Sequence, residues 1–409
     1  MVKKLLKKVF FWNRLSSIRK ERIKSIFGFY TSRIVNPSNM DITDIEVAIF
    51  FADELEKKYQ IEQWLEVLNF LNSQKKILFV VKDRKILHWL QDKSNFTIVY
   101  YQNLESLTTF YSENNIKVVL YVNNGLRNFH SLINSRALHI HINHGESDKT
   151  STISNQVKSY DYSFVVGNAA YDKYEQNLLK KDMHQFIRIG RPQLDFVGKS
   201  NLNINAVVSK KVILYAPTWE GNYSSMNFSS LAQYGLNIVL KLLSSSEYYL
   251  VYKPHPTMGI RDVYIKEINN KIIKLIANST QGKVILEGDI NAIYNSIDLA
   301  IFDNSAVAID YLCIGKPMLM TDMFSHIKDR VSEPIISRAS RLLSDRNLDK
   351  LLLIIDEELK NDTLYSERNR IKEYFLGNYD YSKKESSRLF VSKVKEACIE
   401  RDMLLDRLK

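Results

Sequence analysis

Two histidines lie in short loops that follow strand-like segments, and both are suited to acid–base chemistry. His144 precedes a glycine at the end of the alternating stretch 138–143, where a strand would give way to a turn. An imidazole with the ordinary pKa of about 6.5 accepts a proton from an attacking hydroxyl near neutral pH. His255 lies between two prolines, which stiffen its loop. We predict a general base at His144 and a group that stabilises phosphate charge at His255; the alternative for each is a structural loop histidine.

His139 and His141 alternate with isoleucines just before His144, which puts them on one face of the same predicted strand. Histidines packed in the core or at its rim explain this pattern best. A metal site made of the three histidines would lack a clear acidic fourth ligand. We predict neither a protein-ligated metal ion nor a cofactor.

Two further loops carry polar side chains at the ends of predicted strands. Thr218 follows the strand 212–215 after a proline that fixes the direction of the chain, so its hydroxyl can bond a phosphate oxygen. Lys253 follows the strand 249–252 and leads into the loop of His255. Either loop alone is a weak signal.

The segment 302–311 is predicted as the end of a strand that runs into a helix. Asp303, Asn304 and Ser305 are good N-cap residues, and the helix after them would direct free backbone N–H groups at an anion. Capping alone also explains these residue types. Asp310 lies about a turn and a half further on, where it meets either the hydroxyls of a ligand or only the helix surface.

From about Asp44 onward, short apolar runs alternate with longer helical stretches, which is typical of βα units and a parallel sheet. The predicted strands are 47–51, 77–82, 96–100, 118–122, 138–143, 163–166, 212–215, 249–252, 283–286, 299–302 and 318–320. The predicted helices are 61–71, 104–112, 234–244, 260–278, 306–313, 348–359 and 383–408. We therefore predict two doubly wound α/β domains with a cleft at the carboxyl ends of their strands.

The polar stretch 198–211, which has neither helical nor strand periodicity, marks the junction between the domains. The predicted units are a basic amphipathic segment (1–40), an N-terminal α/β domain (41–198), a C-terminal α/β domain (199–382) and a helix that crosses back to the first domain (383–409). No glycine-rich loop of Walker or dinucleotide spacing occurs in the sequence, which argues against a kinase of that type and against a dehydrogenase.

Composition restricts the class of protein further. A chain of 409 residues with 45% hydrophobic content can bury more than one core. Its two cysteines, Cys313 and Cys398, suggest neither a disulfide framework nor a thiolate metal site, which fits a reducing cytoplasm. No run approaches the roughly 20 apolar residues that span a bilayer. Lysines and arginines interrupt the N-terminal apolar residues, so we expect no export.

Positive charge is concentrated at the N-terminus. Residues 1–35 carry ten lysines or arginines and one acidic residue, a net charge of +9, whereas the whole chain carries +11. Leu5, Val9, Trp12 and Leu15 recur at helical spacing beside lysines, which predicts an amphipathic helix on an anionic membrane surface. The alternative is a helix packed on the domain with a solvated basic rim. Nucleic-acid binding is disfavoured, because no recognised nucleic-acid fold follows.

In order and spacing, the four loops resemble the motifs of the CDP-glycerol glycerophosphotransferase family of teichoic acid and capsule synthesis. The resemblance rests on the His-Gly turn at His144, the Ala-Pro-Thr-Trp loop at Thr218, the Lys-x-His-Pro loop at His255 and the Asp-x-Ser-x-x-x-x-Asp-Tyr segment from Asp303. It implies a GT-B fold, with two facing Rossmann-like domains and a C-terminal crossing helix. It also implies a cytoplasmic enzyme on the inner face of the cell membrane.

The resemblance implies transfer of glycerol phosphate from CDP-glycerol to a hydroxyl of a polymer or lipid-linked acceptor, with release of CMP. His144 would be the general base, and His255 would hold the diphosphate opposite it across the cleft. The remaining donor-binding residues implied are Thr218, Lys253, Ser305, Ala306, Val307 and Asp310.

Two features depart from the family's pattern. Ala306 occupies a position where members commonly carry a second small polar residue, so a hydroxyl near the phosphate is missing. Glu146, Asp148 and Lys149 follow the His-Gly turn and add charge on the predicted acceptor side. A ribitol-phosphate donor, another nucleotide or a capsule-type acceptor is compatible with both changes. The alternatives are a GT-B glycosyltransferase, which would release a nucleoside diphosphate from a nucleotide sugar, and a non-catalytic membrane- or polymer-binding protein.

Overall fold

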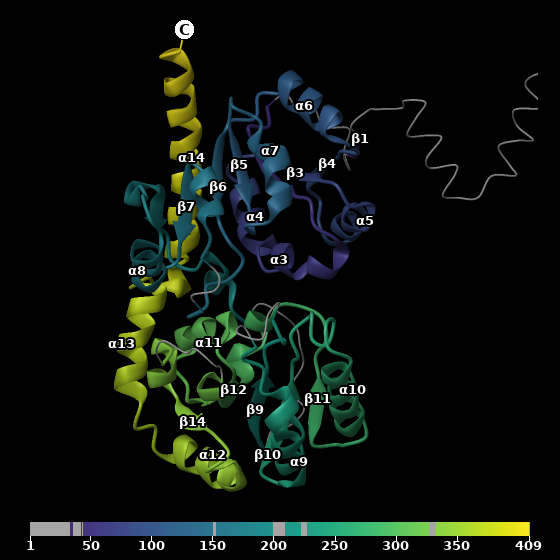
Figure 1. The fold of residues 1–409 in the computed structure, drawn as a ribbon, viewed down its shortest axis with the longest axis vertical. Coiled ribbons are helices and arrows are strands. Elements are labelled where there is room, and N and C mark those ends of the chain that lie inside the picture. The colour runs from purple at the N-terminus through teal and green to yellow at the C-terminus, as the bar shows by residue number, and fades with distance from the viewer. Residues whose placement is uncertain are drawn as a thin grey trace, which may run out of the picture.

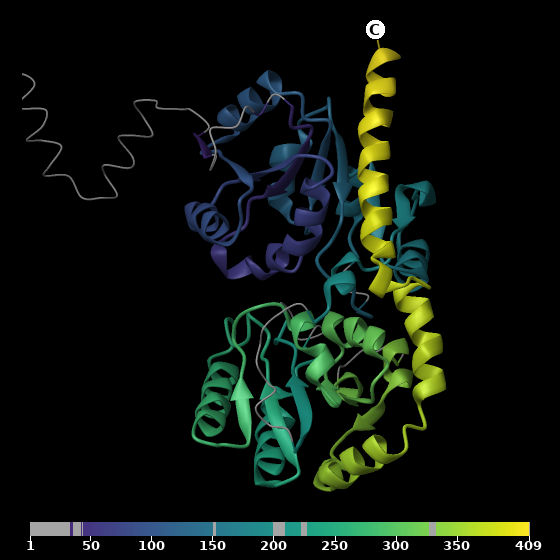
Figure 2. The same ribbon diagram turned by 180° about the vertical axis from the view of Figure 1, so that it is seen from behind.

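The protein consists of two α/β domains stacked end to end, with a long helix running beside the first (Figures 1 and 2). The computed structural model describes residues 33–35, 42, 44–149, 153–198, 209–221, 227–326 and 333–408. Strands β1 to β8 form one sheet and β9 to β14 form another. The predicted α/β class and two-domain architecture are confirmed.

The first domain is built on a sheet with the strand order β1-β4-β3-β2-β5-β6-β7-β8. Strands β2 to β8 run parallel, and β1 pairs antiparallel with β4 at one edge. Central strands such as β2 are apolar throughout because both faces of the sheet are covered. The strands are β1 (Arg33–Val35), β2 (Val47–Phe51), β3 (Ile77–Val81), β4 (Thr97–Tyr100), β5 (Val118–Tyr121), β6 (Leu138–His141), β7 (Tyr162–Val165) and β8 (Phe186–Arg188).

Helices pack on both faces of this sheet. On one face lie α3 (Tyr59–Glu62), α4 (Leu65–Asn72), α5 (Arg84–Lys93) and α14 (Glu385–Asp406). On the other lie α6 (Leu104–Glu113), α7 (Phe129–Leu132) and α8 (Asn168–Asn177). Side chains define where these helices begin: the Asp83 carboxylate accepts from the backbone N–H groups of Lys85 and Ile86 at the start of α5.

The second domain has a parallel sheet with the order β11-β10-β9-β12-β13-β14. Its strands are β9 (Lys211–Ala216), β10 (Tyr248–Tyr252), β11 (Gly282–Val284), β12 (Leu299–Phe302), β13 (Met318–Thr321) and β14 (Arg341–Leu343). Helices α9 (Leu236–Ser244), α10 (Val263–Ala277) and α12 (Leu351–Lys360) cover one face, and α11 (Ala306–Tyr311) and α13 (Tyr365–Leu376) cover the other. This is a doubly wound sheet of Rossmann strand order.

The chain crosses back to the first domain through α13 and α14. Phe375 of α13 belongs to the core of the second domain, whereas Phe390 and Val394 of α14 belong to the core of the first. Figure 2 shows α14 running along the first domain. The first turn of α14 is bound to the segment that follows β8 and leads to the second domain, because the Ser386 hydroxyl donates to the carbonyl of Ile189 at 2.7 Å. The predicted crossing helix is confirmed.

The predicted elements agree with the structure where they are long and buried. The predicted strands match to within about two residues at either end. The predicted helix 61–71 is wrong in one respect, because α3 and α4 are separate helices. The strands not predicted are β1, β8 and β14, and the α-helices not predicted are α5, α7, α8 and α13. The domain boundaries remain predictions.

Within the described ranges, no helix is both long and apolar enough to cross a membrane. The amphipathic helix predicted near the N-terminus lies outside the described residues; of the basic segment 1–35, the structure describes only strand β1. Cys313 and Cys398 are both free thiols, and Cys398 lies on the face of α14 that is buried against the core of the first domain.

Candidate active site

Loops at the carboxyl ends of both sheets meet between the domains. The strand order reverses between β2 and β5 in the first sheet and between β9 and β12 in the second. Ligands of open α/β sheets bind beyond the strand ends at such a reversal. Here the two edges are in contact, because a Cβ on Gly145 would lie only 3.0 Å from the Cβ of Ala306. The candidate active site therefore lies between the two sheets.

His144 is held in a turn directly after β6. Asn143 adopts a positive φ of 53°, and its side-chain oxygen accepts from the His144 backbone N–H at 2.8 Å. The Trp64 indole donates to the carbonyl of Asn143 at 2.6 Å. The Nδ1 atom of His144 lies 3.0 Å from the Val122 carbonyl, which can only accept, so Nδ1 carries the proton and Nε2 has a lone pair. Burial lowers the pKa of His144 to about 4, so this neutral form prevails at pH 7.

His255 has the opposite arrangement of protons. Its Nδ1 accepts from the backbone N–H of Thr257 at 3.2 Å and pairs with the Thr257 hydroxyl at 2.8 Å. Because a backbone N–H can only donate, the ring proton of the neutral imidazole is on Nε2. Burial, assisted by the charge of Lys149, lowers the pKa of His255 to about 3. The ring also stacks on Trp219, with centroids 5.9 Å apart.

Tyr59 brings the two histidines together. Its ring lies edge-on to His144 with centroids 5.9 Å apart, and edge-on to His255 with centroids 5.4 Å apart. The two imidazoles are therefore no further apart than the sum of these distances. His144, with its lone pair at Nε2, and His255, with its N–H at Nε2, thus both contact Tyr59 at the domain boundary.

The loop after β12 is built around a buried carboxylate. Asp303 accepts from the backbone N–H of Thr218 at 2.8 Å, from that of Ser230 at 3.1 Å and from the Thr321 hydroxyl at 2.5 Å. Asp303 thus ties the loop after β9 to the loop after β12, and it does not cap a helix as the sequence pattern suggested. Burial raises its pKa.

Ser305 precedes α11 at the N-cap position without a capping hydrogen bond. Its hydroxyl is buried, and none of the described residues bonds it. The expectation that Ser305 caps the helix through its side chain is therefore wrong. A buried hydroxyl without a partner is costly unless a ligand or water bonds it, so this atom marks a place for a polar ligand.

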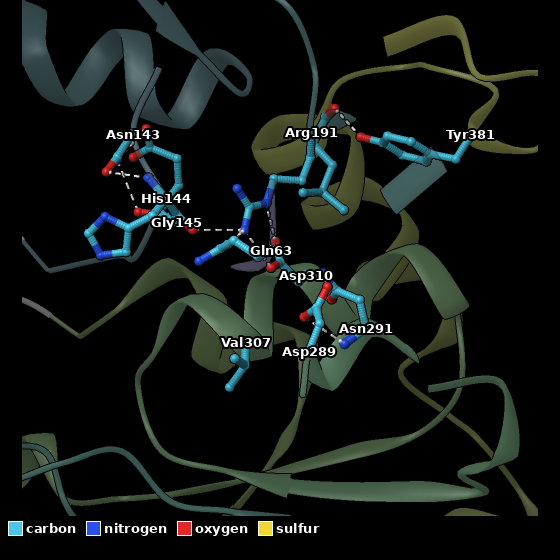
Figure 3. Close-up of polar contacts among 12 residues, drawn as sticks. Gln63, Asn143, His144, Gly145, Arg191, Asp289, Asn291, Val307, Asp310 and Tyr381 are labelled. Atoms are coloured by element: carbon cyan, nitrogen blue, oxygen red, sulfur yellow. Dashed lines mark hydrogen bonds and ion pairs between the residues drawn. The ribbon is translucent and has the colours of Figure 1, made fainter. Parts of the chain in front are cut away.

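Arg191 joins the two domains at the base of the site (Figure 3). Its Nε and Nη2 atoms donate to the two carboxylate oxygens of Asp310 at 2.9 and 3.0 Å. Nη2 also donates to the Gln63 side chain at 2.7 Å and to the main-chain oxygen of His144 at 3.0 Å. Asp310, predicted to contact the donor, is thus held in a bidentate ion pair.

The charged residues after the His-Gly turn are engaged within the protein. Glu146 is buried and pairs with Lys173 at 3.4 Å. Asp148 accepts from the backbone N–H of Ile336 in the second domain at 3.1 Å, and burial raises its pKa. The Lys149 ammonium lies 4.8 Å from the centre of the Phe228 ring, and burial lowers its pKa to about 8. Lys149 thus faces the second domain.

His139 and His141 are core histidines, as the strand pattern predicted. His139 bonds the Tyr121 hydroxyl at 2.7 Å, and His141 stacks on Tyr160 with centroids 5.2 Å apart. Lys253, predicted to bind the donor, is buried, which lowers its pKa. In the part of the chain that the structure describes, no cluster of three or more His, Cys, Asp or Glu residues could hold a metal ion.

Sequence patterns did not identify Tyr59, Gln63, Arg191 or Asp289 at this site. Asp289 interacts electrostatically with both Asp310 and Arg191, and burial raises its pKa to about 6. Tyr59 and Gln63 belong to a helical segment that has no strand end to mark it. Arg191 could have been found if β8 had been recognised, because it lies just beyond the carboxyl end of that strand.

Comparison with known proteins gives the chain a family. The family model described as CDP-Glycerol:Poly(glycerophosphate) glycerophosphotransferase matches residues 47–326. The teichoic acid poly(glycerol phosphate) polymerase of Bacillus spizizenii is 30% identical over 148 residues. That alignment covers 33% of this chain and 34% of the relative, so this chain matches about a third of the relative's length.

Solved structures agree on the fold. A variant of the wall teichoic acid polymerase TagF soaked with CDPG superposes with a TM-score of 0.61 at 14% identity, covering 89% of this chain and 92% of that one. A putative UDP-N-acetylglucosamine 2-epimerase from Listeria monocytogenes superposes with a TM-score of 0.55 at 14% identity, covering 87% and 97%. These neighbours support the predicted GT-B type of fold. Because the family model spans most of both domains, the chain is a transferase that belongs to the CDP-glycerol:poly(glycerophosphate) glycerophosphotransferase family.

Proposed function

We propose that this chain transfers glycerol phosphate, or a related polyol phosphate, from CDP-glycerol to a hydroxyl of a cell-surface polymer or lipid-linked acceptor. The observation that carries the proposal is the opposite protonation of two neighbouring histidines. His144 offers a lone pair at Nε2, and His255 offers an N–H at the same atom. Attack of a hydroxyl on a diphosphate uses one group of each kind. Family membership supports glycerol phosphate as the group transferred.

In the proposed reaction, His144 Nε2 takes the proton of the acceptor hydroxyl while that oxygen attacks the phosphorus that bears glycerol. A bond forms between the acceptor oxygen and this phosphorus, and the bond from phosphorus to the bridging oxygen breaks. CMP leaves with the bridging oxygen and its electron pair. The Nε2–H of His255 stabilises the charge that develops on this leaving group.

We assign the diphosphate of the donor to the loop after β12. Ser305 supplies a buried hydroxyl that is still unbonded, and Ala306 and Val307 supply backbone N–H groups at the start of α11. Thr218 is tied to this loop through Asp303, and Lys253 follows β10 at the same end of the sheet. A donor phosphate would give the buried ammonium of Lys253 a partner for its charge.

We assign Asp310 to the hydroxyls of the donor. Both of its oxygens already accept from Arg191. Each carboxylate oxygen has a second lone pair, so one of them can accept from a donor hydroxyl while the ion pair persists.

We place the acceptor on the side of the His-Gly turn, next to Glu146, Asp148 and Lys149. Because Glu146 and Asp148 bind other parts of the protein, their contribution is to hold this loop in shape. Lys149 supplies a cation for a phosphate group near His255.

We further propose that the enzyme works in the cytoplasm, bound to the inner face of the cell membrane through residues 1–35. The support is the net charge of +9 beside apolar residues at helical spacing. Each lysine or arginine near anionic lipid contributes on the order of 1 kcal/mol. Vesicles rich in phosphatidylglycerol should carry the full chain in a flotation assay at low salt. A variant with Lys3, Lys4, Lys7 and Lys8 replaced by glutamate should stay behind, and equal flotation would contradict the proposal.

The test of the reaction is a turnover assay with CDP-glycerol, CDP-ribitol and common nucleotide sugars, in which the released nucleotide is identified. Release of CMP that depends on an acceptor and is lost in His144→Ala supports the proposal. Release of UDP or another nucleoside diphosphate would identify a GT-B glycosyltransferase instead. Donor binding without turnover, unaffected by His144→Ala, would identify a non-catalytic binding protein.

A further inference from the structure

Arg191 occupies a special place in the chain. It lies on the covalent connection between the two sheets, after β8 and before β9, and is 3% exposed. Gly190, just before it, has a φ of +74°, and a Cβ there would lie 2.7 Å from both the Ser386 hydroxyl and the Tyr379 ring. The Tyr381 hydroxyl contacts the main chain of Arg191 (Figure 3). The backbone at Arg191 is therefore fixed by the segment that leads into α14.

The side chain of Arg191 links elements from both domains. On one side it donates two hydrogen bonds to Asp310 of α11, five residues after Ser305. On the other it bonds the main-chain oxygen of His144 itself. Gln63 supports this arrangement, because it accepts from Arg191 and donates to the carbonyl of Tyr59 at 3.3 Å.

These contacts can exist only while the domains are closed. Gly145 and Ala306 touch across the boundary, so substrates and products of the proposed reaction need the domains to separate. When they separate, the guanidinium has to leave either Asp310 or the carbonyl of His144. A planar guanidinium bonds both at once because it presents several donors in fixed directions, which a lysine ammonium does not.

We propose that Arg191 is a positioning residue that sets His144 against the donor-binding loop when the domains close. The inference rests on the proposed function for its catalytic consequence. Its geometric part, that Arg191 and Asp310 hold the domains closed, is independent of which donor is used.

The experiment compares wild type, Arg191→Lys, Arg191→Met and the double variant Arg191→Met/Asp310→Leu. The single variant Arg191→Met leaves a buried carboxylate unpaired and can unfold the protein, whereas the double variant removes both charges and should remain folded. Arg188→Met is the matched control, because Arg188 is exposed on β8 and its guanidinium lies 3.7 Å from the centre of the Tyr171 ring, outside the site.

For turnover, we expect Arg191→Lys to lower kcat about 100-fold, the effect of misplacing a catalytic group by about an ångström. The donor KM should change less than about threefold, because a lysine still places a cation beside Asp310, the carboxylate that we assign to the donor, and leaves the loop of Ser305 intact. Arg188→Met should match wild type. A rise in donor KM with unchanged kcat would overturn the proposal, since Arg191 would then serve donor binding alone.

For closure, the radius of gyration from small-angle X-ray scattering should increase in the folded double variant relative to wild type and to Arg188→Met. An unchanged radius in the double variant would overturn the proposal. This measurement needs no turnover, so it tests whether Arg191 and Asp310 hold the domains closed even if wild type proves inactive with every CDP-linked donor. Such inactivity would contradict only the proposed function.

Discussion

The two histidine loops are alike in origin and opposite in chemistry. Each follows a parallel strand, each residue is half-buried, and burial lowers the pKa of both. His144 donates from Nδ1 to a backbone carbonyl, whereas His255 accepts at Nδ1 from a backbone N–H. In the proposed reaction Nε2 of each ring faces the ligand, so His144 would act as the base and His255 as the hydrogen-bond donor. The partner of the far nitrogen, and not the residue type, determines the role.

The strongest way to break this comparison is to remove the base. His144→Ala should lower kcat by about 10²- to 10⁴-fold, the usual contribution of general base catalysis. Donor affinity should stay close to that of wild type, because Ser305 and Lys253 belong to the other domain. Calorimetric titration with CDP-glycerol and steady-state kinetics measure the two quantities. A loss of donor affinity equal to the loss of kcat would show that His144 binds the donor.

Removing the donor histidine should affect a different quantity. His255→Ala should lower kcat by about 10²- to 10³-fold, comparable to the loss of one oxyanion donor, and should also weaken donor binding. The same titration and kinetics measure both. If His255→Ala has normal donor affinity but a kcat as low as that of His144→Ala, the base role proposed for His144 has been assigned to the wrong histidine.

The shared burial of the two rings predicts a pH effect on stability. Because the folded pKa values of His144 and His255 are about 4 and about 3, below the unfolded value of about 6.5, the unfolded chain binds more protons between these limits. The histidines therefore contribute stability that is present above pH 6.5 and is lost as the pH falls toward 4. Thermal unfolding midpoints should fall more steeply in wild type than in His144→Asn/His255→Asn over this range.

Other buried groups act equally in both proteins. Asp195 and Asp289 have pKa values raised to about 6 by burial, so they oppose the trend, but they are present in wild type and variant alike. The difference between the two midpoints therefore isolates the cleft histidines. A difference that does not change between pH 7 and pH 4.5 would mean that these rings titrate normally in the folded protein.

Much of the fold could be predicted because parallel strands with both faces covered are continuous apolar runs. Strands β2 and β12 match their predicted limits for this reason. Strands β8 and β14 were not predicted, because each has only three residues, one of them an arginine, and so shows no clear alternation of apolar and polar side chains. The start of α10 was placed too early because Asp262 accepts from the backbone N–H groups of Tyr264 and Ile265 and so caps the helix.

The site divides in the same way. His144, His255 and Ser305 could be predicted because each follows its strand directly in sequence, where the fold class predicts a ligand. Arg191 was missed because the short strand before it, β8, was not recognised, and its pairing with Asp310, 119 residues away in the other domain, leaves no local pattern. The protonation states of the two histidines also could not be predicted from the sequence. They depend on the carbonyl of Val122, just after β5, for His144 and on Thr257 for His255.

A smaller change sharpens the account of His255. Thr257→Val removes the hydroxyl that lies 2.8 Å from Nδ1 and keeps the backbone N–H. The loss of one hydrogen bond worth about 0.5–1.5 kcal/mol should lower kcat about 2- to 13-fold. Thr257→Ser, which keeps the hydroxyl, is the control and should resemble wild type. Equal activity of the valine and serine variants would show that the backbone N–H alone fixes the tautomer.

The smallest expected effect tests whether the two loops must touch for catalysis. A Cβ at residue 145 would lie 3.0 Å from the Cβ of Ala306, so Gly145→Ala must push the base and the donor-binding loop apart by a few tenths of an ångström. We expect a several-fold loss of kcat, well below the roughly 100-fold loss that a full ångström costs. The compensating change Ala306→Gly removes the contact, so Gly145→Ala/Ala306→Gly should recover most of the loss. If the double variant is no better than Gly145→Ala, the defect lies in the His-Gly turn itself, and contact between this turn and the donor-binding loop after β12 is not what sets the rate.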